Sequence, residues 1–423
     1  MTAKYENELP NTLIGTDNPN FVDKVYPFLW KNYSNELNYA TMYAEDWPSI
    51  GTFNYRMIGM SSMPTTHYMR QFQLLINNEG MIEDSSTLCL HGRTRLQVML
   101  DYTQDFMNHY ANHGFFGFTF LSDYSHDQSN HIKWADEILL KFLQNFESSK
   151  LKENTILILF SDHGPRFSNI RSTMKGLLEE RNPFFSIYLP NKFQNQFPDQ
   201  FKIFKANLNS LVTPFDIHET FLDLLFMLKT GKQLKMSVKR TISLFKPIPM
   251  TRTCSDADIE THWCACLKRR KLQINDYAIE LSQKLIKFMN QNILINHLNK
   301  CSFLKLSKLN KIYLLEASDS IRKKQRTVNK ENIFRRLINR IIRPVAKEVE
   351  VVKNFEQYHI QLETVPNYGI YETTLSVERN LKNLKDYTVH IDSNLISRLD
   401  KYGNQSICIH EEFPDLRKYC FCK

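Results

Sequence analysis

The chain of 423 residues contains no apolar run as long as the roughly 18 residues that a membrane-spanning helix needs. Its first residues lack the apolar core of a signal peptide and carry Glu6, Glu8 and Asp17 instead. Glycine and proline are scarce, with 12 and 15 residues, which excludes collagen-like and low-complexity sequences. With 42% hydrophobic residues, the chain is predicted to fold around a sizeable core, as two or three domains or as one large α/β domain with an appendage.

No segment combines basic clusters with the interleaved aromatic residues that nucleic-acid binding requires, so no nucleic-acid partner is expected. The formal net charge is nevertheless +9, and basic residues gather in the C-terminal half, at 268–271, 322–326 and 335–343. Such clusters are typical of a solvated helix face, or of a surface that attracts a membrane surface or an acidic glycan. The sequence leaves both interpretations open.

The eight cysteines are unevenly placed, since seven of them lie at or beyond Cys254. Close pairs such as Cys264 with Cys266 and Cys420 with Cys422 indicate either a disulfide framework or a zinc site. Zinc knuckles prefer two residues between their cysteines, whereas these pairs have one between them. Disulfides are therefore favoured over zinc.

A disulfide framework implies an oxidising compartment, so the protein is expected outside the cell or in the lumen of the secretory pathway. Glycosylation sequons at Asn32 and Asn404 agree with this location. The chain nevertheless has no targeting signal among its first residues. We therefore expect that a signal peptide or membrane anchor is missing from it.

Residues 1–240 alternate between amphipathic segments with helical spacing and short segments rich in β-branched and aromatic residues. The predicted helices are 21–33, 87–110, 130–147 and 216–229. The predicted strands are 38–44, 115–122, 154–160 and 183–189. This alternation predicts an α/β domain whose mostly parallel sheet is flanked by helices.

The alternation stops near residue 240, and residues 241–423 are predicted to form a C-terminal α+β subdomain that contains most of the cysteines. A cysteine-bearing linker at 254–266 precedes a predicted helix at 276–295. Residues 318–345 are polar and basic, as is typical of loops and exposed helices. Alternating residues from 358 to 376 predict a β-hairpin around the turn at 366–369.

The most informative motif follows the apolar strand 154–160 directly. It consists of Ser161, Asp162, His163, Gly164, Pro165, Arg166 and Phe167. A carboxylate and an imidazole at the carboxyl end of a strand lie at the rim of an α/β sheet, where ligands bind. Asp162 and His163 are therefore predicted to hold a divalent metal, zinc or calcium. Two protein ligands are fewer than a zinc site uses, and the alternative is a helix-capping Asp with a structural His.

Two cationic residues, Arg166 and Lys175, lie within or just beyond the motif. An arginine binds a phosphoryl or sulfuryl group through two parallel N–H donors, whereas a lysine acts as a point charge. Arg166 and Lys175 are therefore predicted to bind an anionic substrate. The alternative is that both are ordinary surface cations.

The motif is accompanied by further passages that together resemble one family. These passages are 44–48, 51–55, 64–68, 125–127, 175–184, 213–218, 264–266 and 419–422, together with Cys254. The motif itself resembles the late metal-binding segment of the alkaline-phosphatase/sulfatase superfamily. The whole set resembles the sulfatase-like animal family called domain of unknown function 229, and the likeness is weakest between residues 270 and 350.

The resemblance implies an alkaline-phosphatase-like fold and metal-dependent hydrolysis of phosphate or sulfate esters by an activated hydroxyl nucleophile. It implies that His126 contacts a metal or the oxyanion of the substrate; the alternative is a solvated loop. Asp46, with Glu45, stands where sulfatases carry a sulfate-binding Lys and His, and is predicted to contribute to substrate binding through a cation. The alternative for this acidic pair is a structural role. The expected partner is an anionic ester or a glycan, and a full-length relative is expected to be membrane-anchored.

The same resemblance also implies an early strand with a metal-binding Asp, followed by a Thr, Ser or modified Cys nucleophile, and no passage matches them. The chain is therefore expected to be an N-terminally truncated and inactive member of an enzyme lineage. The alternative is a non-catalytic secreted or lumenal protein that keeps the fold as a binding surface. Loss of an inner strand is expected to leave a sheet edge uncovered.

Overall fold

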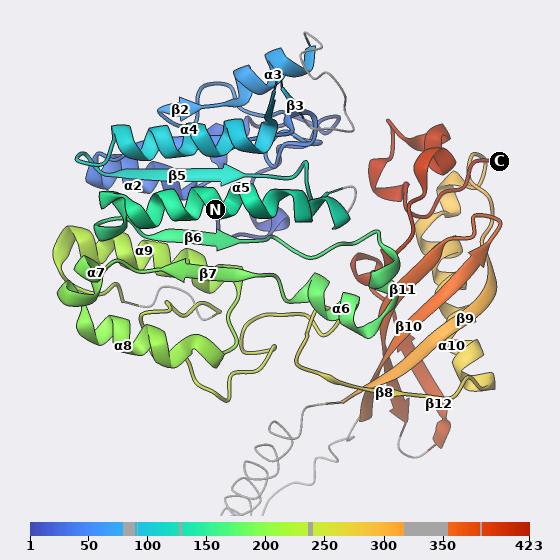
Figure 1. The fold of residues 1–423 in the computed structure, drawn as a ribbon. Coiled ribbons are helices and arrows are strands. Elements are labelled where there is room, and N and C mark those ends of the chain that lie inside the picture. The colour runs from blue at the N-terminus through green and yellow to red at the C-terminus, as the bar shows by residue number, and fades with distance from the viewer. Residues whose placement is uncertain (79–88, 91, 127–128, 236–239, 317–353, 381–382) are drawn as a thin grey trace, which may run out of the picture. The chain divides into compact units, whose positions relative to one another are not determined.

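The structure is a computed structural model that describes the chain except for residues 79–88, 91, 127–128, 236–239, 317–353 and 381–382 (Figure 1). The basic clusters at 322–326 and 335–343 therefore lie outside the described residues, as do most of residues 318–345. The chain divides into two compact units. The first unit contains residues 1–165 and 183–252, and the second contains residues 166–182 and 253–423.

The first unit is built on a parallel sheet, as the sequence predicts. Strand β1 (Ala40–Glu45) lies between β2 (His67–Tyr68) and β5 (Phe115–Phe120), and both neighbours run parallel to it. Every residue of β1 is buried, which is expected for a central strand of a sheet covered on both faces. Its backbone therefore provides a fixed reference for the loops that leave the sheet.

A second strand pair in this unit runs antiparallel, and it includes the strand predicted at 183–189. Strand β6 (Leu157–Phe160) pairs with β7 (Phe185–Tyr188), with Phe160 opposite Phe185. A parallel connection needs a crossover helix packed on the sheet, but α6 (Met174–Arg181), the helix between β6 and β7, belongs to the second unit. The chain therefore returns to the sheet beside β6 in the opposite direction.

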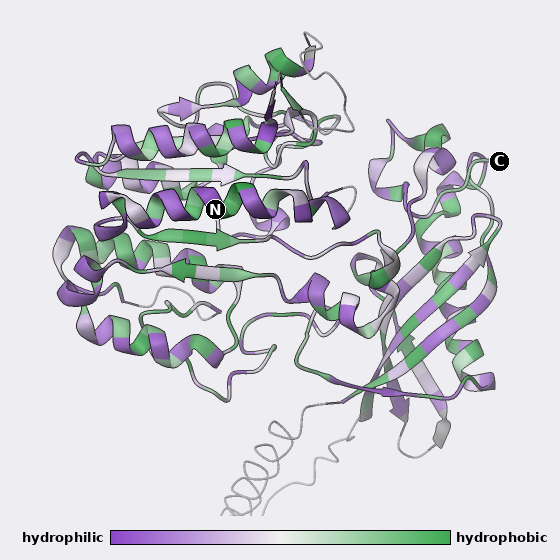
Figure 2. Cartoon of the chain, in the orientation of Figure 1, coloured by the Kyte–Doolittle hydropathy of each residue, from purple (hydrophilic) through white to green (hydrophobic). Residues whose placement is uncertain are grey.

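Strands β5 and β6 are neighbours without being hydrogen-bonded to each other. The rings of Phe118 on β5 and Phe160 on β6 stack with their centroids 6.4 Å apart. Each strand has a hydrogen-bonded partner on one edge, β1 for β5 and β7 for β6, and none on the other edge among the described strands. Both strands are apolar (Figure 2), so these edges combine open backbone groups with hydrophobic side chains.

Helices surround both sets of strands. They are α1 (Val22–Val25), α2 (Leu29–Leu37), α3 (Arg70–Asn78), α4 (Arg95–His109), α5 (Ile132–Ser148), α7 (Asn191–Gln196), α8 (Pro198–Ala206) and α9 (Pro214–Thr230). A short antiparallel pair, β3 (Cys89–Leu90) and β4 (Arg93–Thr94), precedes α4. The predicted helices at 130–147 and 216–229 correspond to α5 and α9.

Two predicted helices differ in their bounds from the observed helices, because of a proline in one and a capping residue in the other. The segment 21–33 is not one helix, because Pro27 cannot continue α1 and the preceding Tyr26 has an extended backbone. In the described part of 87–110, helix α4 begins at Arg95, because the side chain of Thr94 caps the helix by accepting a hydrogen bond from the Gln97 amide at 3.0 Å.

The core of the first unit is largely aromatic on one side of the sheet. The rings of Phe28 and Trp30 stack at 4.2 Å, and Trp30 stacks on Tyr43 of β1 at 5.4 Å. Helices α4 and α5 form a second cluster with aliphatic and aromatic residues, including Leu100 and Phe142. Burial of such side chains contributes roughly 1.5–3 kcal/mol each, so this packing fixes the strand ends that carry the predicted site.

The described part of the second unit is built on an antiparallel sheet, with helix α10 packed against it. Its strands are β8 (Lys268–Lys271), β9 (Lys305–Glu316), β10 (Asn354–Val365), β11 (Ile370–Asn380) and β12 (Asn383–His390), in the order β12-β11-β10-β9-β8, while β13 (Ser397–Arg398) pairs with β11. The predicted hairpin 358–376 is confirmed as part of β10 and β11. Helix α10 (Asp276–Phe288) buries Leu281 and Leu285 against the sheet. Hydrophobic and hydrophilic residues alternate along these strands (Figure 2), as expected when one face is packed and the other is not.

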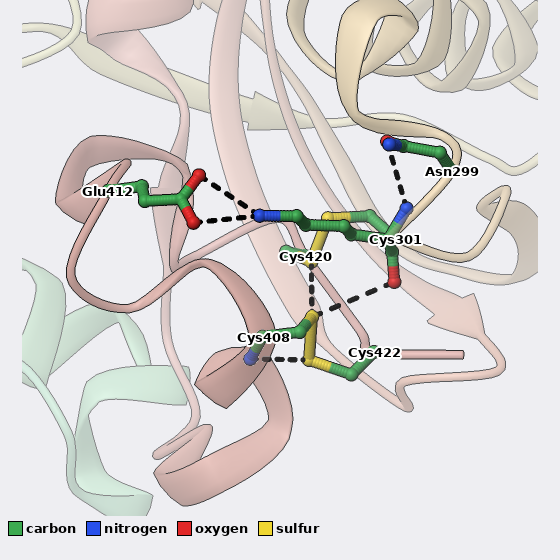
Figure 3. The surroundings of a disulfide bond; sticks show 7 residues. Asn299, Cys301, Cys408, Glu412, Cys420 and Cys422 are labelled. Atoms are coloured by element: carbon green, nitrogen blue, oxygen red, sulfur yellow. Dashed lines mark hydrogen bonds and ion pairs between the residues drawn. A yellow bond between two sulfur atoms is a disulfide. The ribbon is translucent and has the colours of Figure 1, made fainter.

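Three disulfides confirm the disulfide interpretation of the cysteines. They join Cys254 to Cys264, Cys301 to Cys420 and Cys408 to Cys422. The last two lie against each other, with Cys408 Sγ 3.9 Å from Cys420 Sγ (Figure 3). Together they fasten the C-terminal residues to the start of β9. No described helix is long and apolar enough to span a lipid bilayer.

A buried ion network joins segment 166–182 to the sheet of the second unit. Arg171 donates from Nη1 and Nη2 to the two oxygens of Glu372, at 3.2 and 2.8 Å, and Arg181 Nη2 donates to Glu372 at 2.7 Å. Arg171 also pairs with Glu180 at 2.5 Å. All four side chains are at most 7% exposed. Burial raises the pKa of Glu372, but its interactions with His359 and Arg171 outweigh burial and hold this pKa well below the ordinary value.

Two histidines complete this network on its β10–β11 side. His359 Nε2 lies 3.3 Å from Glu372, and His262 Nδ1 lies 3.0 Å from the Thr374 hydroxyl. Burial, together with the charge of Arg181, lowers the pKa of His262 to about 2, and burial also lowers the pKa of His359. The imidazole of His262 is therefore neutral in the folded protein at neutral pH.

We predict that Glu372→Gln lowers the free energy of unfolding of the second unit by about 3–5 kcal/mol, because it leaves two buried guanidinium groups without their shared carboxylate. The matched control is Glu412→Gln, which removes an exposed ion pair with Lys300 (2.9 Å) and is expected to cost less than about 1 kcal/mol. Urea unfolding with hydrogen exchange of the β10 and β11 amides measures both. Equal effects of the two variants would contradict the role given to Glu372.

The same network predicts that the stability of the second unit falls at acidic pH. Because the folded pKa of His262 lies below its unfolded value, the unfolded state takes up a proton as pH falls below about 6.5 and the folded state does not. Stability is therefore complete above that pH and decreases below it, by up to about 1.4 kcal/mol per pH unit for each such histidine. Between pH 7 and pH 5, His262→Asn should reduce this slope.

The control for this prediction is His390→Asn, since the His390 side chain is 53% exposed. It should leave the slope of the β10–β11 exchange free energy against pH unchanged. Identical slopes for wild type, His262→Asn and His390→Asn would show that His262 is not the titrating group.

Candidate functional site

The candidate site lies at one rim of the first unit, where the sequence predicts it. Strands β1 and β5 are parallel, and Figure 1 shows β5 and β6 pointing the same way. The carboxyl ends of all three strands therefore lie on one side. Asp46 follows β1, His126 follows β5, and Asp162 with His163 follows β6.

Asp162 and His163 face each other at the end of β6. Asp162 Oδ2 lies 3.3 Å from His163 Nε2, and the His163 amide donates to Asp162 Oδ1 at 2.8 Å. The side chains are 56% and 34% exposed, so both are accessible to a ligand. The structure thus brings these two predicted metal ligands together.

The tautomer of His163 follows from its other nitrogen. Nδ1 lies 2.7 Å from the carbonyl oxygen of Gly164, which only accepts, so Nδ1 carries the proton and donates. Nε2 faces Asp162 Oδ2 at 3.3 Å; it carries a lone pair in the neutral ring and donates to the carboxylate in the protonated ring. This is the arrangement of a metal-binding histidine, whose second nitrogen donates to a backbone carbonyl.

His126 lies in the loop after β5 and is exposed. Its ring is edge-on to Trp47, with centroids 5.5 Å apart, and its amide donates to the Ser122 carbonyl at 2.9 Å. Among the described residues, the groups of three metal-binding side chains within 4.8 Å of one another consist of cysteines only. His126 therefore does not complete a three-ligand site with Asp162 and His163 in this structure.

Asp46 is buried, and its carboxylate accepts hydrogen bonds from other residues of the chain. Ser122 donates from its amide at 3.0 and 2.9 Å and from its hydroxyl at 2.8 Å, and the Asp123 amide donates at 3.1 Å. Asp46 is 2% exposed, and burial raises its pKa despite the hydrogen bonds from Ser122. This geometry fits the structural alternative, in which Asp46 ties the end of β1 to the loop that carries His126.

Arg95 also holds the end of β1 to the loop that follows β5, and no sequence pattern predicts this role of Arg95. Its Nη1 donates to the Asp46 carbonyl at 2.7 Å and lies 3.1 Å from the Asp123 carboxylate. Glu45 has an equally internal role, since Thr52 donates to it from its amide and hydroxyl at 2.8 and 2.7 Å. A basic residue at the start of a helix gives no sequence signal of this contact.

The two predicted anion-binding cations belong to the second unit. Arg166 is exposed. Lys175 is 77% exposed and pairs with Glu179, one turn further along α6, at 3.7 Å. Their role in substrate binding remains a prediction, as do those of Asp46 and His126.

Comparison with known proteins identifies the family. The family described as "Protein of unknown function (DUF229)" matches residues 1–310. The chain belongs to this family. No curated protein and no solved structure matches the chain. The matched residues include all six candidate site residues of this DUF229 chain. The resemblance to this family that the sequence predicts is therefore confirmed.

We predict that Asp46→Asn lowers the stability of the first unit by about 2–3 kcal/mol, because one amide oxygen cannot accept all the bonds from Ser122 and Asp123. The matched variant at the same rim, Asp162→Asn, removes an exposed carboxylate and should change stability by less than about 0.5 kcal/mol. Amide exchange of β1 and β5 in urea measures both. A stable Asp46→Asn protein would favour the substrate-binding role over the structural one.

Proposed function

We propose that this DUF229 protein derives from the metal-dependent phosphoric and sulfuric ester hydrolases, and that Asp162 and His163 bind a divalent cation, zinc or calcium. The observation that supports this proposal is the placement of His163, whose Nδ1 bonds the Gly164 carbonyl while its Nε2 lies 3.3 Å from Asp162 Oδ2 in an exposed position. Two electron-pair donors that face each other repel unless a cation or a proton lies between them.

The rim also suggests how such a cation would act. A metal at Asp162 and His163 would polarise an ester oxygen and stabilise negative charge that develops on it. The residues of the chain would hold the cation at the end of β6, while the Asp46 junction keeps the His126 loop in place. His126 would then contact a metal or the oxyanion of the substrate.

Hydrolysis also requires an activated nucleophile. The Ser161 hydroxyl accepts a hydrogen bond from the Phe184 amide at 3.0 Å, and the Ser122 hydroxyl donates to Asp46. The resemblance implies a nucleophile that follows an early strand with a metal-binding Asp, and β5 and β6 lie beside each other without a shared hydrogen bond. We therefore propose that the chain by itself binds the cation and does not hydrolyse esters.

A second candidate function is that of a non-catalytic binding protein, in the secretory lumen or outside the cell. The three disulfides support such a compartment. The internal use of Glu45 and Asp46 also favours it, because these carboxylates then stabilise the fold. Its expected ligand is an anionic glycan.

The test is a titration with Zn²⁺ and, separately, Ca²⁺, followed by calorimetry and by the imidazole NMR signals of His163. We expect saturable binding that weakens at least tenfold, about 1.4 kcal/mol, in Asp162→Asn and His163→Asn. The matched control His113→Asn alters an exposed histidine of the same unit and should bind as wild type. Binding that is absent, or that both site variants retain, would refute the cation site.

The same protein is then assayed with p-nitrophenyl phosphate and p-nitrophenyl sulfate. We expect cation binding without hydrolysis above the metal-only control. Metal-dependent hydrolysis that disappears in His163→Asn would instead make the chain a complete enzyme.

A further inference from the structure

Three cysteines of the second unit lie close enough to exchange partners. The Sγ atoms of Cys254, Cys264 and Cys266 all lie within 4.8 Å of one another. Cys254 and Cys264 form a disulfide, whereas Cys266 is a free thiol and exposed. A thiol in this position has a disulfide within reach without a change of fold.

We propose that Cys266 is the attacking thiol of an internal disulfide exchange that converts the Cys254–Cys264 bond into a Cys254–Cys266 bond. The Cys266 thiolate attacks Cys254 Sγ, a new S–S bond forms, and the Cys254–Cys264 bond breaks with its electron pair on Cys264. Cys264 then takes up a proton equivalent to the one that Cys266 released. The number of disulfides is unchanged, so the step needs no oxidant or reductant.

The direction of attack follows from the loop sizes. A bond between Cys264 and Cys266 would close a ring with a single residue between them, and disulfide geometry disfavours such a ring. A bond from Cys254 to Cys266 spans nearly the same loop as the existing one. Cys254 is therefore the sulfur that changes partner.

The surroundings of the thiols set the conditions for exchange. Burial raises the pKa of Cys266, so only a minor fraction is thiolate at neutral pH and exchange accelerates as pH rises. The leaving sulfur belongs to Cys264, which is 2% exposed, whereas Cys266 is open to solvent. The exchange therefore replaces an exposed free thiol, Cys266, by a buried free thiol, Cys264.

The exchange also bears on the buried ion network. Cys264 lies two residues after His262, which contacts Thr374, and the ring of the intervening Trp263 lies 5.4 Å from the Arg181 guanidinium. The Cys264 carbonyl accepts from Arg269 Nη2 at 3.2 Å. The Cys254–Cys264 disulfide thus holds in place the segment that contains His262. A bond to Cys266 instead of Cys264 leaves this segment less constrained.

The first test is a time course on the whole wild-type chain. Protein purified at pH 5 is incubated at pH 7, 8 or 9, quenched in acidic denaturant and labelled there with N-ethylmaleimide. Fragment mass spectrometry then locates the label within 264–266. We expect label to move from Cys266 to Cys264, about tenfold faster at pH 8 than at pH 7, because the thiolate fraction rises in that proportion.

Two variants provide the matched comparison. Oxidised Cys264→Ser is expected to contain a Cys254–Cys266 disulfide, whereas Cys254→Ser should retain two free thiols at Cys264 and Cys266. In the exchanged form, the β10 and β11 amides should exchange faster with solvent. Label that stays on Cys266 at every pH, a Cys266–Cys89 bond, or a Cys264–Cys266 bond in Cys254→Ser would overturn the proposal.

Discussion

The second unit depends on the carboxylate of Glu372, which lies within hydrogen-bond or ion-pair distance of Arg171, Arg181 and His359. Taking these groups out of water is costly, and the network is stable only because each charge has a close counter-charge. Arg171 and Arg181 come from residues 166–182, whereas Glu372 lies on β11. The interaction therefore decides that this segment belongs to the second unit, although its first two residues, Arg166 and Phe167, are part of the motif that follows β6.

That assignment explains the strand order beside the candidate site. A connection whose helix packed on the first sheet would favour a parallel β7, but the arginines of η5 (Asn169–Ser172) and α6 are bound to Glu372. The chain leaves β6 at Ser161 and returns at Phe184, where the Phe184 amide donates to the Ser161 hydroxyl. Asp162 and His163 occupy the first residues of this excursion, which keeps them exposed at the sheet rim.

The sequence predicts those features whose cause is local. The parallel strands β1 and β5, the amphipathic helices α5 and α9, the hairpin of β10 and β11 and the position of Asp162 and His163 follow from periodicity and turn residues. The direction of β7 could not be predicted, because it depends on Arg171 and Glu372, which are 201 residues apart. The junction of Arg95 with Asp46 has the same difficulty, since neither residue belongs to a local pattern.

The contrast between Asp46 and Asp162 shows why a carboxylate at the right strand end is not sufficient evidence of a site. Both follow a strand of the same rim, yet Asp46 is buried and accepts hydrogen bonds from Ser122 and Asp123, whereas Asp162 is exposed beside His163. A metal ion would have to displace those bonds to reach Asp46, whereas Asp162 is accessible to a ligand without such a loss. The two carboxylates of the rim therefore differ in their surroundings, because one holds the loops together and the other lies exposed beside His163.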